Sequence, residues 1–266
     1  MSTDASALRT RREPPAFRRV TVAGVSPLTP RLVRVTLAGA ELKGFVVDQP
    51  AASVRLLLPS PGSHDLVMPA WNGNEFLRPD GSRPAIRTLT PLRHDPDAHR
   101  LDVEIVVHDG GVASAWAQAA EEGDEVALSG PGRGYTVEED AAGFLVAGDE
   151  SAIPAIGQVL EAVPAGTPVR VFVEVADPAA RLDLPAHPKA AVEWLDLPAG
   201  APPGDAMVGA VTAADLPEGT SVWAAGEAAA VQRIRRHLFA ERGLPRSAAW
   251  IRGYWKTGKA GEAGDG

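Results

Sequence analysis

The chain of 266 residues contains no cysteine. Disulfide bonds, iron–sulfur clusters, cysteine-ligated zinc and thiolate catalysis are therefore excluded, so any redox chemistry must come from a bound cofactor. The six histidines are scattered without the spacing of a metal site, and we expect no metal ligands.

Long apolar runs and a positive net charge are also absent. No apolar run approaches the length of a membrane-spanning helix, and residues 1–15 are polar and basic, without the apolar core of a secretory signal. The formal net charge of −8 and the sequence pI of about 5.3 argue against binding to nucleic acid or to an acidic membrane surface. We therefore predict a cytoplasmic monomer without stable membrane insertion, whose residues 1–15 form a disordered leader.

The chain length and the hydrophobic content of 45% suit two domains of ordinary size. Short strands separated by glycine- and proline-containing turns predict an antiparallel β-barrel over residues 16–137. Its strands are expected at residues 17–25, 31–37, 53–59, 85–90, 101–107 and 125–129, with one helix at 112–120. Residues 60–82 are rich in glycine, proline and asparagine and are expected to form a long surface loop of undetermined function.

Beyond a boundary at residues 138–143, strands and helices alternate. Such alternation predicts a parallel sheet covered by helices over residues 142–258. Strands are expected at residues 144–147, 169–175, 190–195, 222–225 and 248–254, and helices at 152–162, 208–216 and 228–242. The glycine-rich tail at residues 259–266 is expected to be disordered.

Two stretches of the first domain carry groups suited to an anionic ligand. Arg87 ends a predicted strand, and a guanidinium can hold an oxyanion through two donors. The stretch His108–Ser114 follows another strand and opens a helix, whose N-terminus offers backbone N–H groups and a partial positive charge to a phosphate. Gly110 and Gly111 let the backbone approach closely, and Ser114 adds a hydroxyl. This combination suits a dinucleotide lying over the barrel.

Five motifs follow one another between residues 16 and 258. They are Arg87-x-Leu89-Thr90, His108-x-x-Gly111-x-Ala113-Ser114-x-Trp116-Ala117, Gly148-Asp149-Glu150-Ser151-Ala152-Ile153-Pro154-Ala155, Gly226-Glu227 and Gly253-Tyr254-Trp255-Lys256-x-Gly258. In this order they resemble the motifs of the siderophore-interacting proteins, flavin-dependent ferric-siderophore reductases of the ferredoxin-reductase-like superfamily. The resemblance implies a barrel that binds FAD, followed by an NAD(P)H-binding-like α/β domain with the C-terminal signature of the family.

The resemblance also implies the cofactor contacts. Those to FAD are Arg87, Thr88, Leu89, Thr90, His108, Gly110, Gly111, Val112, Ala113, Ser114, Tyr254 and Trp255. Leu89 stands where the family usually has tyrosine, so the stacking ring and its hydroxyl are lost, and Val112 stands where proline is usual. Other interpretations stay open: Arg87 as a strand-end surface cation beside a core leucine, His108 as a packed or capping group, and Tyr254 and Trp255 as aromatics of the domain interface.

By analogy with the superfamily, the turn at residues 148–152 would bind a nicotinamide dinucleotide. The implied contacts are Asp149, Glu150, Ser151, Ala152 and Asp177. The turn is not a G-x-G-x-x-G, and its two carboxylates are expected to cap the next helix and to repel a pyrophosphate. Asp177 favours NADH and Arg181 favours NADPH, so the coenzyme stays open, with reduced ferredoxin as another possible donor.

The implied function is reduction of the iron of a ferric siderophore, with no catalytic side chain because the flavin carries the electrons. Ferric siderophores are often anionic, and Arg55, Arg133 and Lys256 are the candidate cations for attracting them. Two other functions stay open: a flavodoxin or ferredoxin reductase that acts on a protein partner, and a non-catalytic protein that binds flavin or siderophore.

Overall fold

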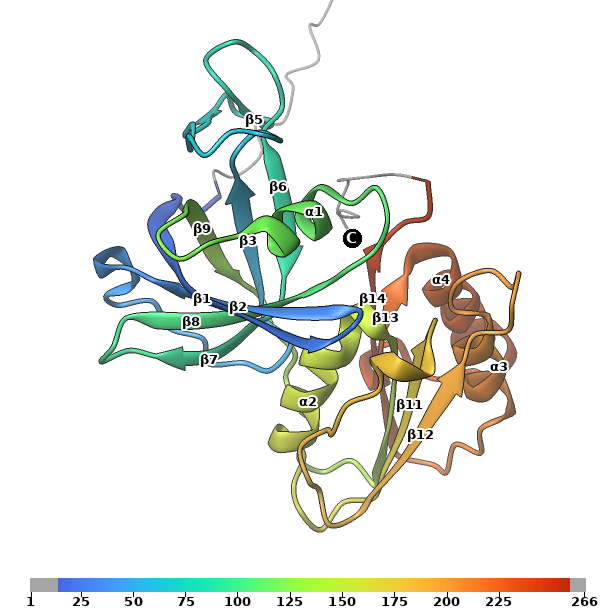
Figure 1. Ribbon diagram of the computed structural model, residues 1–266. Coiled ribbons are helices and arrows are strands. Elements are labelled where there is room, and N and C mark those ends of the chain that lie inside the picture. The colour runs from blue at the N-terminus through green and yellow to red at the C-terminus, as the bar shows by residue number, and fades with distance from the viewer. Residues whose placement is uncertain (1–13, 259–266) are drawn as a thin grey trace, which may run out of the picture.

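The computed structural model describes residues 14–258 (Figure 1). Most of the expected leader, and the whole of the expected tail at residues 259–266, lie outside the described residues. An all-antiparallel unit comes first, and a unit of alternating strands and helices starts at Gly143. None of the helices within residues 14–258 is long and apolar enough to cross a bilayer.

The first unit is a seven-stranded antiparallel sheet in the order β6-β3-β9-β1-β2-β8-β7. The strands are β1 (Arg18–Thr29), β2 (Leu32–Ala38), β3 (Ser53–Leu58), β6 (Ala85–Leu89), β7 (Pro91–Asp95), β8 (Arg100–Val106) and β9 (Glu125–Gly132). In Figure 1 the strands β3, β6 and β9 run across β1, β2, β7 and β8, so the sheet folds over on itself. Alternate residues of these strands fill the space between, among them Val20, Val35, Leu37, Val54, Leu56, Leu101, Val103 and Leu128. The predicted antiparallel barrel is confirmed.

Three parts of this unit differ from the sequence-based prediction. Strand β1 runs through to Thr29 instead of ending before the proline-containing turn, because Pro27 is accommodated at a register shift. Strand β7 was not expected. Residues 60–82 contain a short hairpin, β4 (Ala70–Trp71) with β5 (Phe76–Leu77), in which the two aromatic rings pack edge to face at 5.1 Å. The remaining elements are η1 (Ala40–Leu42) and α1 (Val112–Ala119).

The second unit is a parallel sheet, as predicted, and its five strands follow the order β12-β11-β10-β13-β14. The strands are β10 (Gly143–Asp149), β11 (Val169–Val175), β12 (Ala190–Asp196), β13 (Thr220–Glu227) and β14 (Ala249–Trp255). The helices are η2 (Glu150–Ala152), α2 (Ile153–Ala162), η3 (Pro178–Ala180), α3 (Asp205–Ala213), α4 (Ala228–Arg236), η4 (His237–Glu241) and η5 (Arg246–Ala248). The last long helix therefore ends as α-helix at Arg236, before the predicted end at residue 242, and continues as a π-helical turn.

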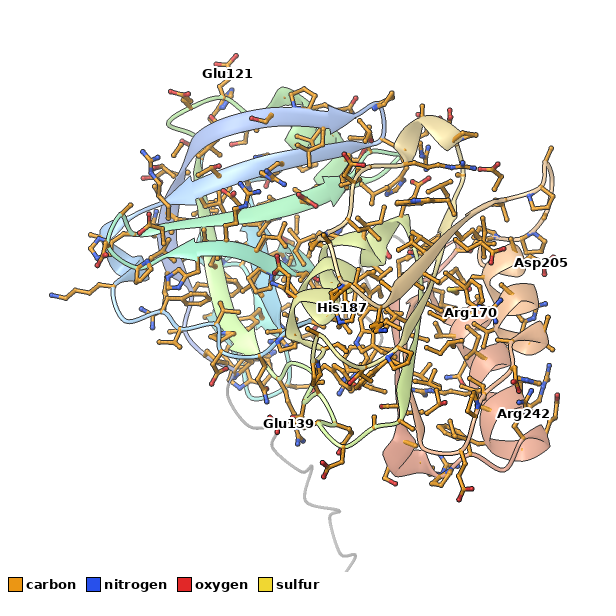
Figure 2. The ribbon with its side chains drawn as sticks, turned by 90° about the horizontal axis from the view of Figure 1, so that it is seen from below. Glu121, Glu139, Arg170, His187, Asp205 and Arg242 are labelled. Atoms are coloured by element: carbon orange, nitrogen blue, oxygen red, sulfur yellow. The ribbon has the colours of Figure 1, made fainter. Side chains whose placement is uncertain are left out.

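Helices cover both faces of the parallel sheet. Residues of α2 pack on one face, with Val146 and Trp223, whereas α3 and α4 pack on the other, with Leu145 and Phe172. Figure 2 shows α2 between the barrel and the sheet, and Asp205 at the start of α3 on the side away from the barrel. The carboxyl end of β10 lies beside the barrel, because Glu150, which follows β10, accepts from Arg31 between β1 and β2. In open α/β sheets, ligands bind at the carboxyl ends of the strands.

Three buried carboxylates cap the helices that start at this edge of the sheet. Asp149, Glu174 and Glu227 are only 6%, 3% and 3% exposed. Asp149 accepts from the η2 turn at 2.9 Å, Glu174 from the start of α3 at 2.6 and 3.0 Å, and Glu227 from the start of α4 at 2.5 and 3.0 Å. The chain thus fills these helix N-termini with its own negative charges.

Burial raises the pKa of the Glu174 carboxyl above its ordinary value near 4.5, and the charge of Asp149 adds to the rise, against the lowering by three backbone N–H groups. The stability contributed by the protonated form is fully present below the unfolded pKa and is lost as the pH rises through the folded pKa. We compare the free energy of unfolding of the unmutated protein with that of Glu174→Gln. The advantage of the unmutated protein should fall as the pH rises from about 4.5. Urea unfolding across this range measures it, with exposed Glu193→Gln as control. A difference that grows with pH contradicts the prediction.

Candidate functional site

Arg87 lies on the edge strand β6 and is half-buried. Its Nη1 atom donates to the carbonyl of Ile86 at 2.8 Å, and within residues 14–258 no carboxylate pairs with its guanidinium. Burial lowers the pKa of this guanidinium, as expected for a cation without an anionic partner. The remaining N–H donors of Arg87 can therefore serve an anionic ligand.

The turn that leads into α1 is held by Ser114. Its hydroxyl accepts from the backbone N–H of His108 at 2.9 Å and donates to the carbonyl of His108 at 2.7 Å, and the side chain is only 2% exposed. The hydroxyl proton predicted to serve a phosphate is therefore already used. The role of Ser114 in this structure is to fix the shape of the turn.

Glycine is required at positions 110 and 111 of this turn for two different reasons. Gly110 has a φ of +75°, which favours glycine. A Cβ atom on Gly111 would lie 2.5 Å from Cε1 of His108, so the exposed imidazole occupies the space beside that residue. The backbone at Gly110 is therefore open to close approach by a ligand, whereas Gly111 is covered on its Cβ side by His108.

Within residues 14–258, no side chain caps the N-terminus of α1, which starts after Gly111. The starts of η2, α3 and α4 at the edge of the parallel sheet differ, since buried carboxylates occupy them. Val112 and Ala113 of α1 and Leu89 of β6 pack against the barrel core, and both α1 and β6 contact strand β8. Backbone N–H groups and a guanidinium are the donors that a pyrophosphate requires, and the residues present fit the FAD expected there.

The C-terminal strand meets the barrel beside the end of β6. The Tyr254 hydroxyl interacts with the side chain of Thr90, which is 7% exposed, and burial raises the pKa of Tyr254. The Tyr254 ring is edge-on to Trp223 at 6.4 Å. Thr88 is exposed, and its Cα partner across the sheet is Arg55 of β3. Tyr254 thus contacts the motif that carries Arg87.

Asp149 faces into the protein. One carboxylate oxygen accepts from the N–H and hydroxyl of Ser151 at 2.9 and 2.5 Å, and the other accepts from Glu227 N and Trp255 Nε1, both at 2.8 Å. A Cβ atom on Gly226, where φ is +151°, would lie 2.6 Å from this second oxygen. Burial raises the pKa of Asp149 against these hydrogen bonds. Asp149 therefore ties β10, β13 and β14 together.

Glu150 is also buried, at 7% exposure, and has a partner that the sequence did not indicate. Both of its carboxylate oxygens accept from Nε of Arg31, at 3.0 and 2.8 Å, and one also accepts from the N–H of Ala176 at 2.7 Å. The expected repulsion of a pyrophosphate by two carboxylates is therefore wrong in part, because Arg31 of the barrel neutralises Glu150. Ala152 is fully buried, and Ser151 is half-buried.

The residues considered for coenzyme preference lie after β11. Asp177 is exposed and caps η3 by accepting from Ala179 N at 2.8 Å, whereas Arg181 pairs with Asp196. Both side chains are bonded to nearby residues of the second unit, so they do not decide between NADH and NADPH.

Two arginines line one pocket of about 230 Å³ at the domain junction, together with Tyr135, Ser221 and Trp250. They are the predicted Arg133 and, unexpectedly, Arg252 of β14. The guanidinium of Arg252 lies 5.2 Å from the ring centre of Trp250, which stacks on Trp223 at 5.3 Å. Arg55 and Lys256 are exposed and do not line this pocket. The alternation Trp250-x-Arg252-x-Tyr254 on a terminal strand was the signal that could have revealed Arg252.

Comparison with known families identifies the chain. A model described as the siderophore-interacting FAD-binding domain matches residues 9–135, and one described as siderophore-interacting protein matches residues 141–258. The chain belongs to the siderophore-interacting proteins. Both the predicted family and the predicted ferredoxin-reductase-like fold are confirmed.

Relatives of this siderophore-interacting protein match along most of their length. The ferric vibriobactin reductase ViuB of Vibrio cholerae is 33% identical over 237 residues, which cover 87% of this chain and 86% of that protein. The NADPH-dependent ferric-chelate reductase of Escherichia coli is 34% identical over 247 residues, or 90% of this chain and 92% of that protein. The crystal structure of a siderophore utilization protein from T. fusca has a TM-score of 0.83 at 35% identity and covers 95% of this chain and 97% of that one.

Proposed function

We propose that this siderophore-interacting protein is an FAD-dependent oxidoreductase that reduces ferric siderophores with electrons from NAD(P)H. The observation that carries the proposal is the half-buried Arg87, which has no carboxylate partner within residues 14–258, on a strand that contacts β8, as does the uncapped helix α1. Family models match residues 9–135 and 141–258 of the chain. Reduction releases iron because hard oxygen ligands hold ferric iron far better than ferrous iron. We further propose that the protein acts in the cytoplasm as a monomer, with residues 16–137 as the FAD domain and 142–258 as the nucleotide domain.

Bound FAD would take electrons from the nucleotide and pass them singly to the iron. The residues of the protein bind and orient the cofactor and the substrate. Arg87 and the backbone N–H groups at the start of α1 hold the pyrophosphate, with Gly110 permitting the approach. The other proposed flavin contacts are Thr88, Leu89, Thr90, His108, Gly111, Val112, Ala113, Ser114, Tyr254 and Trp255, of which Ser114 acts through the turn.

We propose NADPH as the donor, since the Escherichia coli relative is named for it. It would lie at the carboxyl edge of the parallel sheet, beside Asp149, Glu150, Ser151, Ala152 and Asp177. Reduced ferredoxin is the alternative donor.

The pocket with Arg133 and Arg252 would receive the ferric siderophore. The lining contains two guanidiniums and one carboxylate, that of Glu138, so the cations are in excess and would attract an anionic chelate in a protein whose net charge is −8. Arg55 and Lys256, both exposed, would extend this cationic surface.

Arg133→Ala and Arg252→Ala should each raise the KM for an anionic ferric tris-catecholate by roughly 5–10-fold, because one charge-assisted contact is lost. The rate of flavin reduction by NADPH should not change. The effect should shrink as the salt concentration is raised. Exposed Arg100, at the start of β8, provides the control substitution. A KM unchanged in both variants removes this pocket from the substrate site.

Steady-state assays with NADPH distinguish the proposed function from its alternatives. We expect ferrous iron to accumulate from a ferric siderophore in the presence of a ferrous chelator. Activity with a purified electron-carrier protein and none with ferric chelates would favour a flavodoxin or ferredoxin reductase. A bound flavin that no donor reduces would indicate a binding protein.

A further inference from the structure

Arg31 lies at the tip of the β1–β2 hairpin, which reaches the start of α2 in the second domain (Figure 1). Its backbone is fixed on both sides: its N–H donates to Thr29 Oγ1 at 3.1 Å, and its carbonyl accepts from Val107 N at 2.8 Å. Val107 directly precedes the turn at His108 that leads into α1. Arg31 therefore lies between the turn expected to hold FAD phosphates and the turn expected to hold a nicotinamide dinucleotide.

The side chain of Arg31 is anchored through one atom. Nε donates to both carboxylate oxygens of Glu150, and within residues 14–258 the Nη1 and Nη2 atoms donate no hydrogen bond. The side chain is 30% exposed, so these terminal nitrogens can reach a ligand. By contrast, Arg34 on the next strand uses both Nε and Nη2 on Glu104, at 3.1 and 2.6 Å. The guanidinium of Arg31 is thus held through Nε, while its two Nη atoms, the Nη fork, remain free to donate to a ligand.

We propose that the Nη fork of Arg31 binds the pyrophosphate of the nicotinamide dinucleotide, so that the FAD domain supplies a phosphate ligand to the nucleotide domain. This inference rests on the proposed function. A guanidinium fork matches two phosphate oxygens, and the fixed Nε sets its orientation beforehand.

The charges around Arg31 favour the nicotinamide dinucleotide over FAD. At the edge of the parallel sheet, the carboxylates of Asp149, Glu174 and Glu227 already occupy helix starts, and Asp177 adds another negative charge. A pyrophosphate at this edge therefore needs a cation from elsewhere, which Arg31 provides. FAD, in contrast, has Arg87 and the uncapped start of α1.

The test compares flavin-loaded Arg31→Met/Glu150→Gln with the parent. Removing both charges leaves no buried carboxylate unpaired, and the amide oxygen introduced at position 150 can still accept from the N–H of Ala176. The matched control is Arg34→Met/Glu104→Gln, which removes a second arginine–glutamate pair, formed between an arginine of the same hairpin and β8. A third variant, Arg31→Lys, keeps the charge beside Glu150 and removes the fork.

Calorimetry measures the Kd of NADP⁺, steady-state kinetics separate KM from kcat for NADPH, and flavin fluorescence gives the Kd of FAD. In Arg31→Met/Glu150→Gln we expect the Kd of NADP⁺ and the KM for NADPH to rise roughly tenfold or more. We expect a smaller rise in Arg31→Lys, and parental values in the control. The Kd of FAD should stay at its parental value in all three variants.

An unchanged Kd for NADP⁺ in Arg31→Met/Glu150→Gln overturns the proposal. A loss of FAD from this variant, with NADP⁺ binding intact, also overturns it and would show that the Nη atoms of Arg31 bind the flavin. Measurements on the unmutated protein distinguish a failure of this inference from a failure of the proposed function. A parent that neither binds NADP⁺ nor is reduced by NADPH contradicts the proposed donor itself, whereas a reducible parent with unaffected variants contradicts only the role of Arg31.

Discussion

Arg87→Ala should lower the affinity for FAD by roughly 10–100-fold, because a charge-assisted contact to phosphate contributes about 1.5–3 kcal/mol. The guanidinium is half-buried and has no carboxylate partner among the described residues, so its removal leaves no charge unpaired in the apoprotein. The loss should therefore appear in cofactor binding and not in folding. Fluorescence titration of apoprotein with FAD measures the dissociation constant, and thermal unfolding of the apoprotein measures stability.

Arg93→Ala provides the control, because Arg93 is an exposed arginine on β7, the next strand along the chain. Its FAD affinity should equal that of the parent. An Arg87→Ala protein that purifies with full flavin and full activity would remove Arg87 from the site.

Asp149→Ala should lower the free energy of unfolding by about 3–4 kcal/mol, because each buried donor left without a partner costs about 1–3 kcal/mol. The carboxylate accepts four hydrogen bonds, and its removal leaves donors of Ser151, Glu227 and Trp255 without this partner. Glu227 is 3% exposed, Ser151 is half-buried and Trp255 is 37% exposed. Of these donors, the hydroxyl of Ser151 can find water. Release of the Trp255 indole should also loosen the end of β14. Urea unfolding measures the loss, and tryptophan fluorescence reports the environment of the indole.

Asp177→Ala is the matched comparison. Asp177 also caps a short helix, but it is exposed and accepts a single backbone hydrogen bond at 2.8 Å. We expect its loss to cost about 1 kcal/mol or less. Equal losses in the two variants would show that Asp149 does not hold the three strands together.

Local patterns predicted the elements whose sequences are distinctive. Strand β11 was predicted with its observed bounds, since four β-branched valines at every second position favour a strand. Strand β7 was missed because exposed Arg93 and Asp95 interrupt its apolar character. The helix expected to reach residue 242 changes to π-helical geometry after Arg236, a change that apolar spacing does not reveal.

The site was predictable only where its residues follow one another along the chain. Arg87 and the turn before α1 were found from such local motifs, but motif order did not show that the hydroxyl of Ser114 is used within the turn. The partner of Glu150 lies 119 positions away in Arg31, so no spacing rule connects them. Likewise Arg252 joins Arg133 only through the docking of β14 beside the junction between the domains. Contacts between the two units were the part that only the structure provided.

The most direct test of the account is a single anaerobic turnover without a nucleotide donor. The flavin-loaded protein is photoreduced and mixed with a ferric siderophore and a ferrous chelator, while the flavin and ferrous absorbance bands are followed together. Since a reduced flavin holds two electrons and each iron takes one, the account predicts flavin reoxidation with about two trapped ferrous ions per flavin. A reduced flavin that stays reduced beside the ferric siderophore, with no ferrous iron trapped, would contradict it.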